Sequence, residues 1–428
     1  MAEVLERTPV FPAPAGEGMR VAVISMHTSP TAPLGRLGNG GMNVYVREVC
    51  RRLAERGVAT DVYTAADAAA SGLAEGSRVI QLPLSTPGHG KYALLDQVPA
   101  FADALVAHAA RDHLSYDLVY SHYWLSGAVA RLVHAELEAA WVHTAHTLGI
   151  VKNRSLAIGA QPEPESRIQV ERQVARSADL LIASTEAERS ALIDDYGADP
   201  RAVAVVQPGV DLAVFSPQPL PGTPIVPRLP ERFLLFVGRL ERLKGAETAL
   251  RALSLLGDEY PDLCLVVVGE DSGDAGESEL SRLRDVAAGL GLGSRVQFHR
   301  AVEHELLPAY FRAALACVVP SHSESFGLVA LEAQACGCPV VAANVPGLAS
   351  IVRDGVSGFL IDGWEAGAYA QQLRLLLRSP ELREQMGRRA TVLAQRFDWP
   401  RTVGAILANM TRVMTQAQLG VQVRSAHE

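Results

Sequence analysis

The feature that most constrains this chain is the alternation of short apolar runs with longer amphipathic stretches. The runs are rich in β-branched residues, show no polar alternation and end at turn-forming residues, which is typical of strands covered on both faces. After the first run, Val46 and Val49 share one face of a predicted helix at 44–56. This alternation predicts βαβ units and parallel sheets. The predicted strands are 20–25, 60–63, 118–121, 141–144, 180–183, 203–206, 233–237, 264–268, 296–298, 316–319, 339–342 and 359–361.

A proline-rich segment divides the pattern into two halves. Seven prolines lie between residues 207 and 230, where they exclude a helix or a central strand, and the βα pattern restarts at residue 233. We therefore predict two Rossmann-like, doubly wound α/β domains that face each other across a ligand-binding cleft. The predicted boundaries are a flexible arm at 1–18, a first domain at 19–210, a linker at 211–231 and a second domain at 232–396.

Composition narrows the class of protein. Lys and Arg number 39 against 47 Asp and Glu, a net charge of −8, which does not supply the basic footprint of a nucleic-acid binder. No run of about 18 uncharged apolar residues predicts a membrane helix, and residues 1–18 lack the apolar region of a secretory signal. The five cysteines have neither redox nor zinc spacing, and we expect buried, reduced thiols. These features predict a cytoplasmic protein without nucleic-acid or membrane partners.

A glycine-rich segment, Gly35-Arg-Leu-Gly-Asn-Gly-Gly-Met-Asn43, lies between the first predicted strand and the helix that follows it. Glycines there allow the backbone to approach a phosphate or a sugar, and the helix N-terminus favours an anion. The segment lacks the glycine spacing of a dinucleotide-binding loop, so a simple flexible turn is the alternative.

Two cations follow the first strand of the second domain, in the segment Gly238-Arg239-Leu-Glu-Arg-Leu-Lys244-Gly245. Cations at the carboxyl end of a strand and at a helix N-terminus can hold a diphosphate without a metal ion. The alternative is solvated surface charge, because Arg242 lies between them.

Two carboxylates, Glu324 and Glu332, follow the predicted strand 316–319. Eight helical residues would separate them by about 12 Å, whereas glycosidase pairs are about 5–9.5 Å apart. We therefore favour two separate hydroxyl-binding carboxylates, one for a sugar and one for a ribose. A helix cap with a surface glutamate is the alternative.

Histidines and cations are the candidate groups of the first domain. His122, His143 and His146 follow predicted parallel strands, so they are expected at the mouth of the cleft. No acidic cluster accompanies His143 and His146, which disfavours a metal pair. The basic residues that could bind a phosphorylated acceptor, unless they are ordinary surface charge, are Lys91, Lys152, Arg154 and Arg167.

Taken together, these motifs resemble the retaining glycosyltransferases of family four, which have the GT-B fold. The resemblance rests on Gly238-Arg239, Lys244-Gly245 and the Glu324-x7-Glu332 spacing, and it extends from about Arg20 to the C-terminus. It implies that the segment 397–428 is a helix that crosses back to the first domain. Segments similar to the members that act on inositol phosphate are 24–30, 40–45, 121–127, 143–148, 151–153 and 324–334.

The resemblance implies specific roles in a nucleotide-sugar donor site and an acceptor site. The implied donor site consists of Gly41, Arg239 and Lys244 at the diphosphate, Glu324 at the sugar, Glu332 at the ribose and Val302 at the base, with Phe326, Gly327 and Leu328. The implied acceptor site consists of His27 and Asn43 at ring hydroxyls and of Lys91, Tyr123, Thr147 and Arg167 at a phosphate. The implied catalytic residues are Arg239, Lys244 and Glu324, with His146 orienting the reacting groups.

The implied activity is retaining transfer of N-acetylglucosamine or glucose from a UDP-sugar to a small phosphorylated acceptor, inositol phosphate. Gly38-Asn39 stands where that branch of the family usually carries an aspartate, and transfer to fructose 6-phosphate, as in the sucrose-phosphate synthases, is the alternative. An inactive sugar-nucleotide-binding regulatory module is the alternative from another class. Catalysis is expected to need no metal cofactor because two fixed cations replace it, while a peripheral Mg²⁺ and a homodimer are left open.

Overall fold

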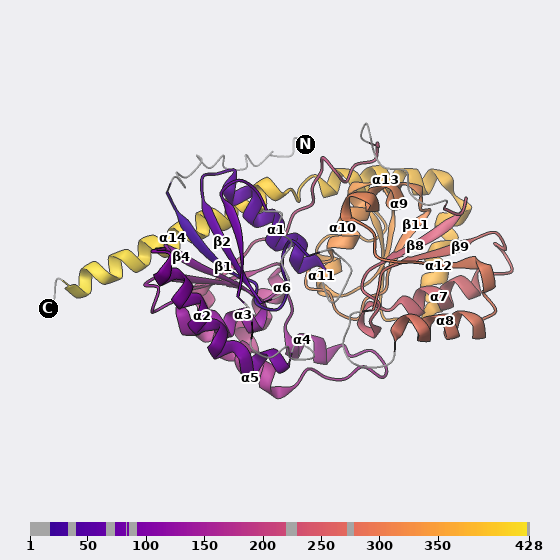
Figure 1. Cartoon of the computed structure of the whole chain (residues 1–428). Helices are drawn as coiled ribbons and strands as arrows, with labels where there is room; N and C mark the ends of the chain where they lie inside the picture. Colours follow the sequence, from indigo (N-terminus) through magenta and orange to yellow (C-terminus); the bar gives the residue numbers. More distant parts are fainter. Residues whose placement is uncertain are drawn as a thin grey trace.

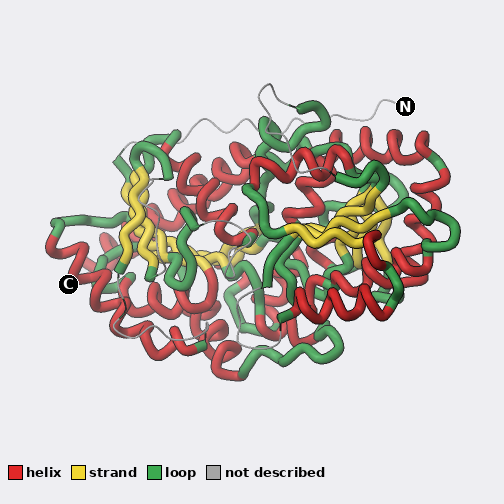
Figure 2. Tube along the Cα trace, turned by 45° about the vertical axis from the view of Figure 1, so that its right-hand side comes forward, coloured by secondary structure: helices red, strands yellow, loops and turns green. Residues whose placement is uncertain are grey.

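The computed structural model describes residues 18–32, 40–65, 73–82, 84, 92–219, 229–271 and 278–425. Within these residues, two parallel sheets of seven and six strands each lie between layers of helices (Figures 1 and 2). The expected pair of doubly wound domains is confirmed. Nearly all of the predicted arm at 1–18, together with Gly38, Asn39 and Lys91, lies outside the described residues.

The first sheet has the order β3-β2-β1-β4-β5-β6-β7. Its order reverses between β1 and β4, which opens a crevice at the carboxyl ends of these strands. The strands are β1 (Arg20–Ile24), β2 (Ala59–Thr64), β3 (Ser77–Gln81), β4 (Leu118–His122), β5 (Ala140–Thr144), β6 (Leu180–Ala183) and β7 (Val203–Val205). The helices of this half are α1 (Gly41–Ala54), α2 (Val98–Arg111), α3 (Tyr123–Val133), α4 (Gly149–Arg154), α5 (Glu165–Ser177) and α6 (Glu186–Asp194).

The second sheet repeats this plan with the order β10-β9-β8-β11-β12-β13, and its switch point lies between β8 and β11. The strands are β8 (Phe233–Val237), β9 (Cys264–Val268), β10 (Val296–His299), β11 (Ala316–Val319), β12 (Val340–Ala343) and β13 (Gly358–Ile361). The helices are α7 (Ala246–Leu255), α8 (Glu279–Gly289), α9 (Leu307–Ala313), α10 (Leu328–Ala335), α11 (Pro346–Ala349), α12 (Ala366–Arg378) and α13 (Pro380–Ala394).

The last helix, α14 (Trp399–Ser425), returns to the first sheet, as the yellow ribbon of Figure 1 shows. Its buried face, including Trp399, Val403 and Ile406, joins the same core as the apolar face of α1. At its start, Thr402 Oγ1 donates a hydrogen bond of 2.8 Å to the carbonyl of Gln207. The chain therefore crosses between the two halves twice, before β8 and before α14.

The predicted strands are all present, with ends shifted by at most one residue, but β3 was not predicted. Only Ser77 of this edge strand is buried, so β3 lacks the continuous apolar run that marked the others. All five cysteines are free, and four are buried as expected. Cys264 is an exception, since it begins β9 and is half-buried. In the described part of the chain, no helix is long and apolar enough to span a membrane.

Candidate active site

The candidate site lies where the carboxyl ends of the two sheets meet. Contacts that join the halves there include two hydrogen bonds: Ser325 Oγ donates to the carbonyl of His146, and Arg242 Nη1 donates to the carbonyl of Ile158 at 3.1 Å. Both sheets direct their strand ends, and hence the loops that follow, toward this junction (Figure 1). A ligand held here would contact both halves of the molecule.

The loops after β8 and β11 bring Lys244 to Glu324. Lys244 Nζ lies 2.6 Å from Glu324 Oε1, which also accepts a hydrogen bond of 3.0 Å from Ser321 Oγ. Gly245 permits this approach: it has a φ of 71°, and a Cβ there would lie 2.2 Å from the carbonyl oxygen of Pro320. An ammonium has three donors, so Lys244 can hold Glu324 and still donate to a ligand.

Arg239 faces the first domain at the start of α1. A Cβ on Gly40 would lie 3.6 Å from Arg239 Nε, and a Cβ on Gly41 would lie 3.3 Å from a methyl of Leu328. Glycines thus keep the N-terminus of α1 close to the second domain. The structure brings together three predicted donor residues, Gly41, Arg239 and Leu328. Near them, Gly327 precedes α10 with a φ of 101°, and Phe326 is buried in the core of the second domain.

Asn43 anchors the start of α1 through internal hydrogen bonds. Its Nδ2 donates to Thr28 Oγ1 at 2.6 Å and to the Ser29 carbonyl at 2.7 Å, and its Oδ1 accepts from the Gly40 amide at 3.1 Å. The amide of Asn43, which the resemblance assigned to an acceptor hydroxyl, is therefore engaged in holding the loop after β1 onto α1.

The predicted phosphate-binding residues converge around Arg167 on α5. Arg167 Nη1 donates to Tyr123 Oη at 3.2 Å, and Nη2 donates to Thr147 Oγ1 at 2.9 Å. The His27 ring packs against the Tyr123 ring at a tilt of 34°, with centroids 4.5 Å apart. Lys91 lies outside the described residues, and its place in this set stays a prediction.

Two carboxylates that the sequence reasoning missed neutralise Arg167. The guanidinium is fully buried and pairs with Glu171 at 2.6 Å and with Glu163 at 2.9 Å. Lys152 also pairs with Glu163. Glu171 lies one helical turn after Arg167 on α5, so this spacing could have revealed it, whereas Glu163 lies in the loop before the helix and has no such local signal.

His122, at the end of β4, and His146, in the loop after β5, form a pair in which His122 is buried and His146 is partly buried. His122 Nδ1 and His146 Nε2 lie 3.0 Å apart. His146 and Tyr123, the residue after His122, have φ values of 60° and 76°. Backbone strain of this kind costs about 1–3 kcal/mol per residue and is concentrated at functional sites. Burial lowers the pKa of His146 to about 3, aided by His143 and His27, and lowers that of His122 well below its usual value. His146 is therefore a neutral imidazole near pH 7.

His143 predicts a specific pH dependence of stability. Burial lowers its pKa to about 3 in the folded state, whereas an unfolded histidine titrates near pH 6.5. Between these values the unfolded chain binds a proton that the folded chain does not, so stability falls as the pH falls. From pH 7 to pH 5, the free energy of unfolding should fall by about 2 kcal/mol more in the wild type than in His143→Gln. Denaturant titrations at both pH values measure this difference, and equal losses would contradict the assignment.

Glu332 has a partner that the sequence analysis missed. His304 Nε2 lies 2.7 Å from Glu332 Oε1, and both side chains are nearly buried. Burial alone would lower the pKa of His304, but the Glu332 carboxylate outweighs it and raises the pKa above its usual value. His304 lies two residues after Val302, which the structure places against the core of the second domain. In the described residues no group of three or more His, Cys, Asp or Glu side chains could hold a metal ion.

Two family models match the chain. Residues 40–209 match a glycosyl transferase 4-like domain, and residues 225–392 match the glycosyl transferases group 1. The first match covers most of the first sheet with its helices, and the second covers the second sheet. The fold and the site thus define a glycosyltransferase of the GT-B class.

Proteins similar to this chain identify its family within the GT-B class. The D-inositol 3-phosphate glycosyltransferase of Thermobifida fusca is 44% identical over 418 residues, which cover 95% of this chain and 96% of that protein. The protein of the same name from Geodermatophilus obscurus is 45% identical over 404 residues, covering 92% and 89%. The chain belongs to this family of glycosyltransferases.

Solved structures share the fold over nearly the whole chain. The sucrose-phosphate synthase of Thermosynechococcus elongatus is 30% identical, with a TM-score of 0.81, and the alignment covers 93% of this chain and 100% of that chain. HepE of Anabaena, in complex with UDP and glucose, is 22% identical, with a TM-score of 0.74 and coverage of 92% and 99%.

Proposed function

We propose that this enzyme transfers a sugar from a UDP-sugar to inositol phosphate with retention of the anomeric configuration, in the cytoplasm. The observation that carries the proposal is the convergence of Arg167, Tyr123 and Thr147 in the first domain, opposite the Lys244–Glu324 pair of the second. One group suits a phosphorylated acceptor and the other suits a sugar diphosphate. The names of the relatives at 44–45% identity support inositol phosphate as the acceptor.

Arg239 and Lys244 are proposed to stabilise the leaving diphosphate. As the bond between the sugar and the diphosphate breaks, negative charge accumulates on the diphosphate oxygens, and fixed cations beside a helix N-terminus stabilise that charge. Glu324 is held by Lys244 and Ser321, so its carboxylate is oriented to accept hydrogen bonds from sugar hydroxyls. The shared fold of HepE, which holds UDP and glucose, supports a UDP-sugar donor.

The proton of the attacking hydroxyl is proposed to pass to the leaving phosphate oxygen, because attack from the same face brings these atoms together. His146 is neutral near pH 7 and is fixed by His122, so it acts as a hydrogen-bonding group that orients the reactants. Retention is tested by nuclear magnetic resonance of the initial product. An α-linked product from an α-linked donor is expected, and a β-linked product would contradict the mechanism.

Transfer to fructose 6-phosphate is the second candidate, favoured by the 30% identity to a sucrose-phosphate synthase. Both acceptors carry a phosphate, so the site formed by Arg167, Tyr123 and Thr147 could bind either of them and does not distinguish them. Product identification with each acceptor distinguishes the two candidates.

Domain closure on the donor is a further expectation, because the donor groups lie on both sides of the junction between the halves. Addition of the UDP-sugar should shift the protein toward the arrangement in which Ser325 contacts His146. Small-angle X-ray scattering should then show a smaller radius of gyration. An unchanged radius would indicate a preformed cleft.

A further inference from the structure

Glu332 is held in place by His304. The 2.7 Å contact occupies one carboxylate oxygen, and the side chains are only 6% and 12% exposed. The His304 ring also packs on Phe215, with centroids 4.8 Å apart. A carboxylate has about four lone-pair sites, so Glu332 can accept from His304 and from ligand hydroxyls at the same time.

The other nitrogen of His304 faces the opposite half of the molecule. Arg47 Nη2, on α1, lies 3.4 Å from His304 Nδ1, and Arg47 also pairs with Glu305 at 3.8 Å. Arginine can only donate, so in the neutral ring this contact makes Nδ1 the acceptor and places the hydrogen on Nε2, toward Glu332. The protonated ring, which the Glu332 carboxylate favours by raising the pKa of His304, also carries a hydrogen on Nε2. Arg47 thereby favours the tautomer that donates to Glu332.

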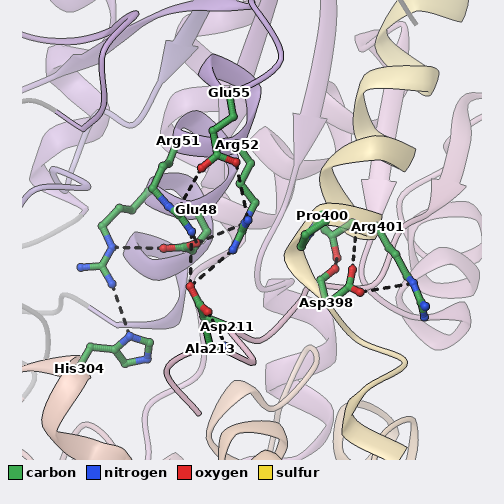
Figure 3. A network of polar contacts seen from close by, with 12 residues as sticks. Glu48, Arg51, Arg52, Glu55, Asp211, Ala213, His304, Asp398, Pro400 and Arg401 are labelled. Carbon is green, nitrogen blue, oxygen red and sulfur yellow. Dashed lines mark hydrogen bonds and ion pairs between the residues drawn. The ribbon is translucent and has the colours of Figure 1, made fainter. Parts of the chain in front are cut away.

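This contact belongs to a larger network along α1, in which Figure 3 places His304 at one end. Arg47 and Arg51 both pair with Glu48, at 3.9 and 2.8 Å, and Arg51 reaches Asp211 at 3.4 Å. Asp211 lies in the segment between the two sheets. At its N-terminus the same helix carries Gly41, opposite Arg239 and Leu328. The position of α1 therefore affects both the diphosphate side and the Glu332 side of the donor site.

We propose that His304 is a positioning residue that orients Glu332 to accept hydrogen bonds from the ribose hydroxyls of the donor. Arg47 of the other domain completes this arrangement when it contacts His304. Recognition of the ribose is thus completed by closure of the two halves. This inference rests on the proposed function, in which Glu332 binds the ribose of a nucleotide-sugar donor.

The test compares binding of UDP and of 2′,3′-dideoxy-UDP by calorimetry. The wild type should bind UDP at least tenfold more tightly than the analogue, because the analogue lacks the hydroxyls that donate hydrogen bonds to Glu332. His304→Ala should reduce this preference to within about threefold, and Arg47→Met should also reduce it. His304→Gln, which retains a donor toward Glu332, should preserve most of it. Arg56→Met is the matched control, because it removes the same charge just beyond the C-terminal end of α1, far from His304.

A role in folding alone would lower the thermal stability of the His304 variants and leave the preference for UDP unchanged. An unchanged preference for UDP in His304→Ala or in Arg47→Met overturns the proposal. If His304→Ala does not fold, Arg47→Met still tests the proposal, because Arg47 is partly exposed and its replacement should be tolerated. If the wild type binds neither nucleotide, the proposed function itself fails.

Discussion

Replacing Lys244 or Arg239 by alanine should reduce kcat by about 10²–10³, the effect of losing one fixed charge donor at a developing anion. Lys244 has a second role, because it holds Glu324 at 2.6 Å. Lys244→Ala should therefore also raise the KM of the donor. Steady-state kinetics with saturating acceptor measure both effects.

Arg251→Ala is the matched control for these variants. Arg251 lies on α7, just after the segment that carries both cations, and its partly exposed guanidinium pairs with Glu247 on the same helix at 2.6 Å. Its removal should leave kcat within a few-fold of the wild type. If Lys244→Ala and Arg239→Ala fold normally and turn over at the wild-type rate, the assignment of both residues to the donor diphosphate is wrong.

Replacing Arg167 by alanine should raise the KM of the acceptor at least tenfold and leave the KM of the donor nearly unchanged. The change removes a hydrogen bond to a charged group, which contributes about 1.5–3 kcal/mol. It also leaves Glu163 and Glu171 without their guanidinium partner in a buried site. We therefore expect a loss of about 3–5 kcal/mol in the free energy of unfolding as well.

Two milder variants separate binding from stability. Thr147→Val and Tyr123→Phe remove hydroxyls that Arg167 contacts but leave its two carboxylate partners in place. Each should raise the KM of the acceptor severalfold with little change in melting temperature. A normal acceptor KM in all three variants would show that the phosphate binds elsewhere.

The sequence predicts the fold well because the local signals and the global fold agree. Strands buried on both faces are continuous apolar runs, so β1, β8 and β9 are recognisable without any partner. β3 escapes prediction because an edge strand with one solvated face carries no such run. The placement of Tyr123 and Thr147 near Arg167 also follows from topology, since β4 and β5 are neighbours and end at the same edge.

The contacts that complete the site are harder to predict, because their partners are distant in sequence. His304 and Arg47 are 257 residues apart, and nothing local to either residue indicates the other. Likewise, the pairing of His122 with His146 depends on the register of β4 and β5 and on a strained backbone at His146. The sequence indicates which residues reach the cleft, but only the packed structure shows which groups orient them.

The central claim is glycosyl transfer to a phosphorylated inositol, and release of UDP tests it most directly. UDP-N-acetylglucosamine and UDP-glucose are each incubated with inositol phosphate, fructose 6-phosphate, free inositol or free fructose, and UDP release is measured in every pair. We predict rapid release with inositol phosphate for one of the donors and at least tenfold slower release with every unphosphorylated acceptor. Equal rates with free inositol, faster release with fructose 6-phosphate, or donor binding without release in any pair would contradict the account.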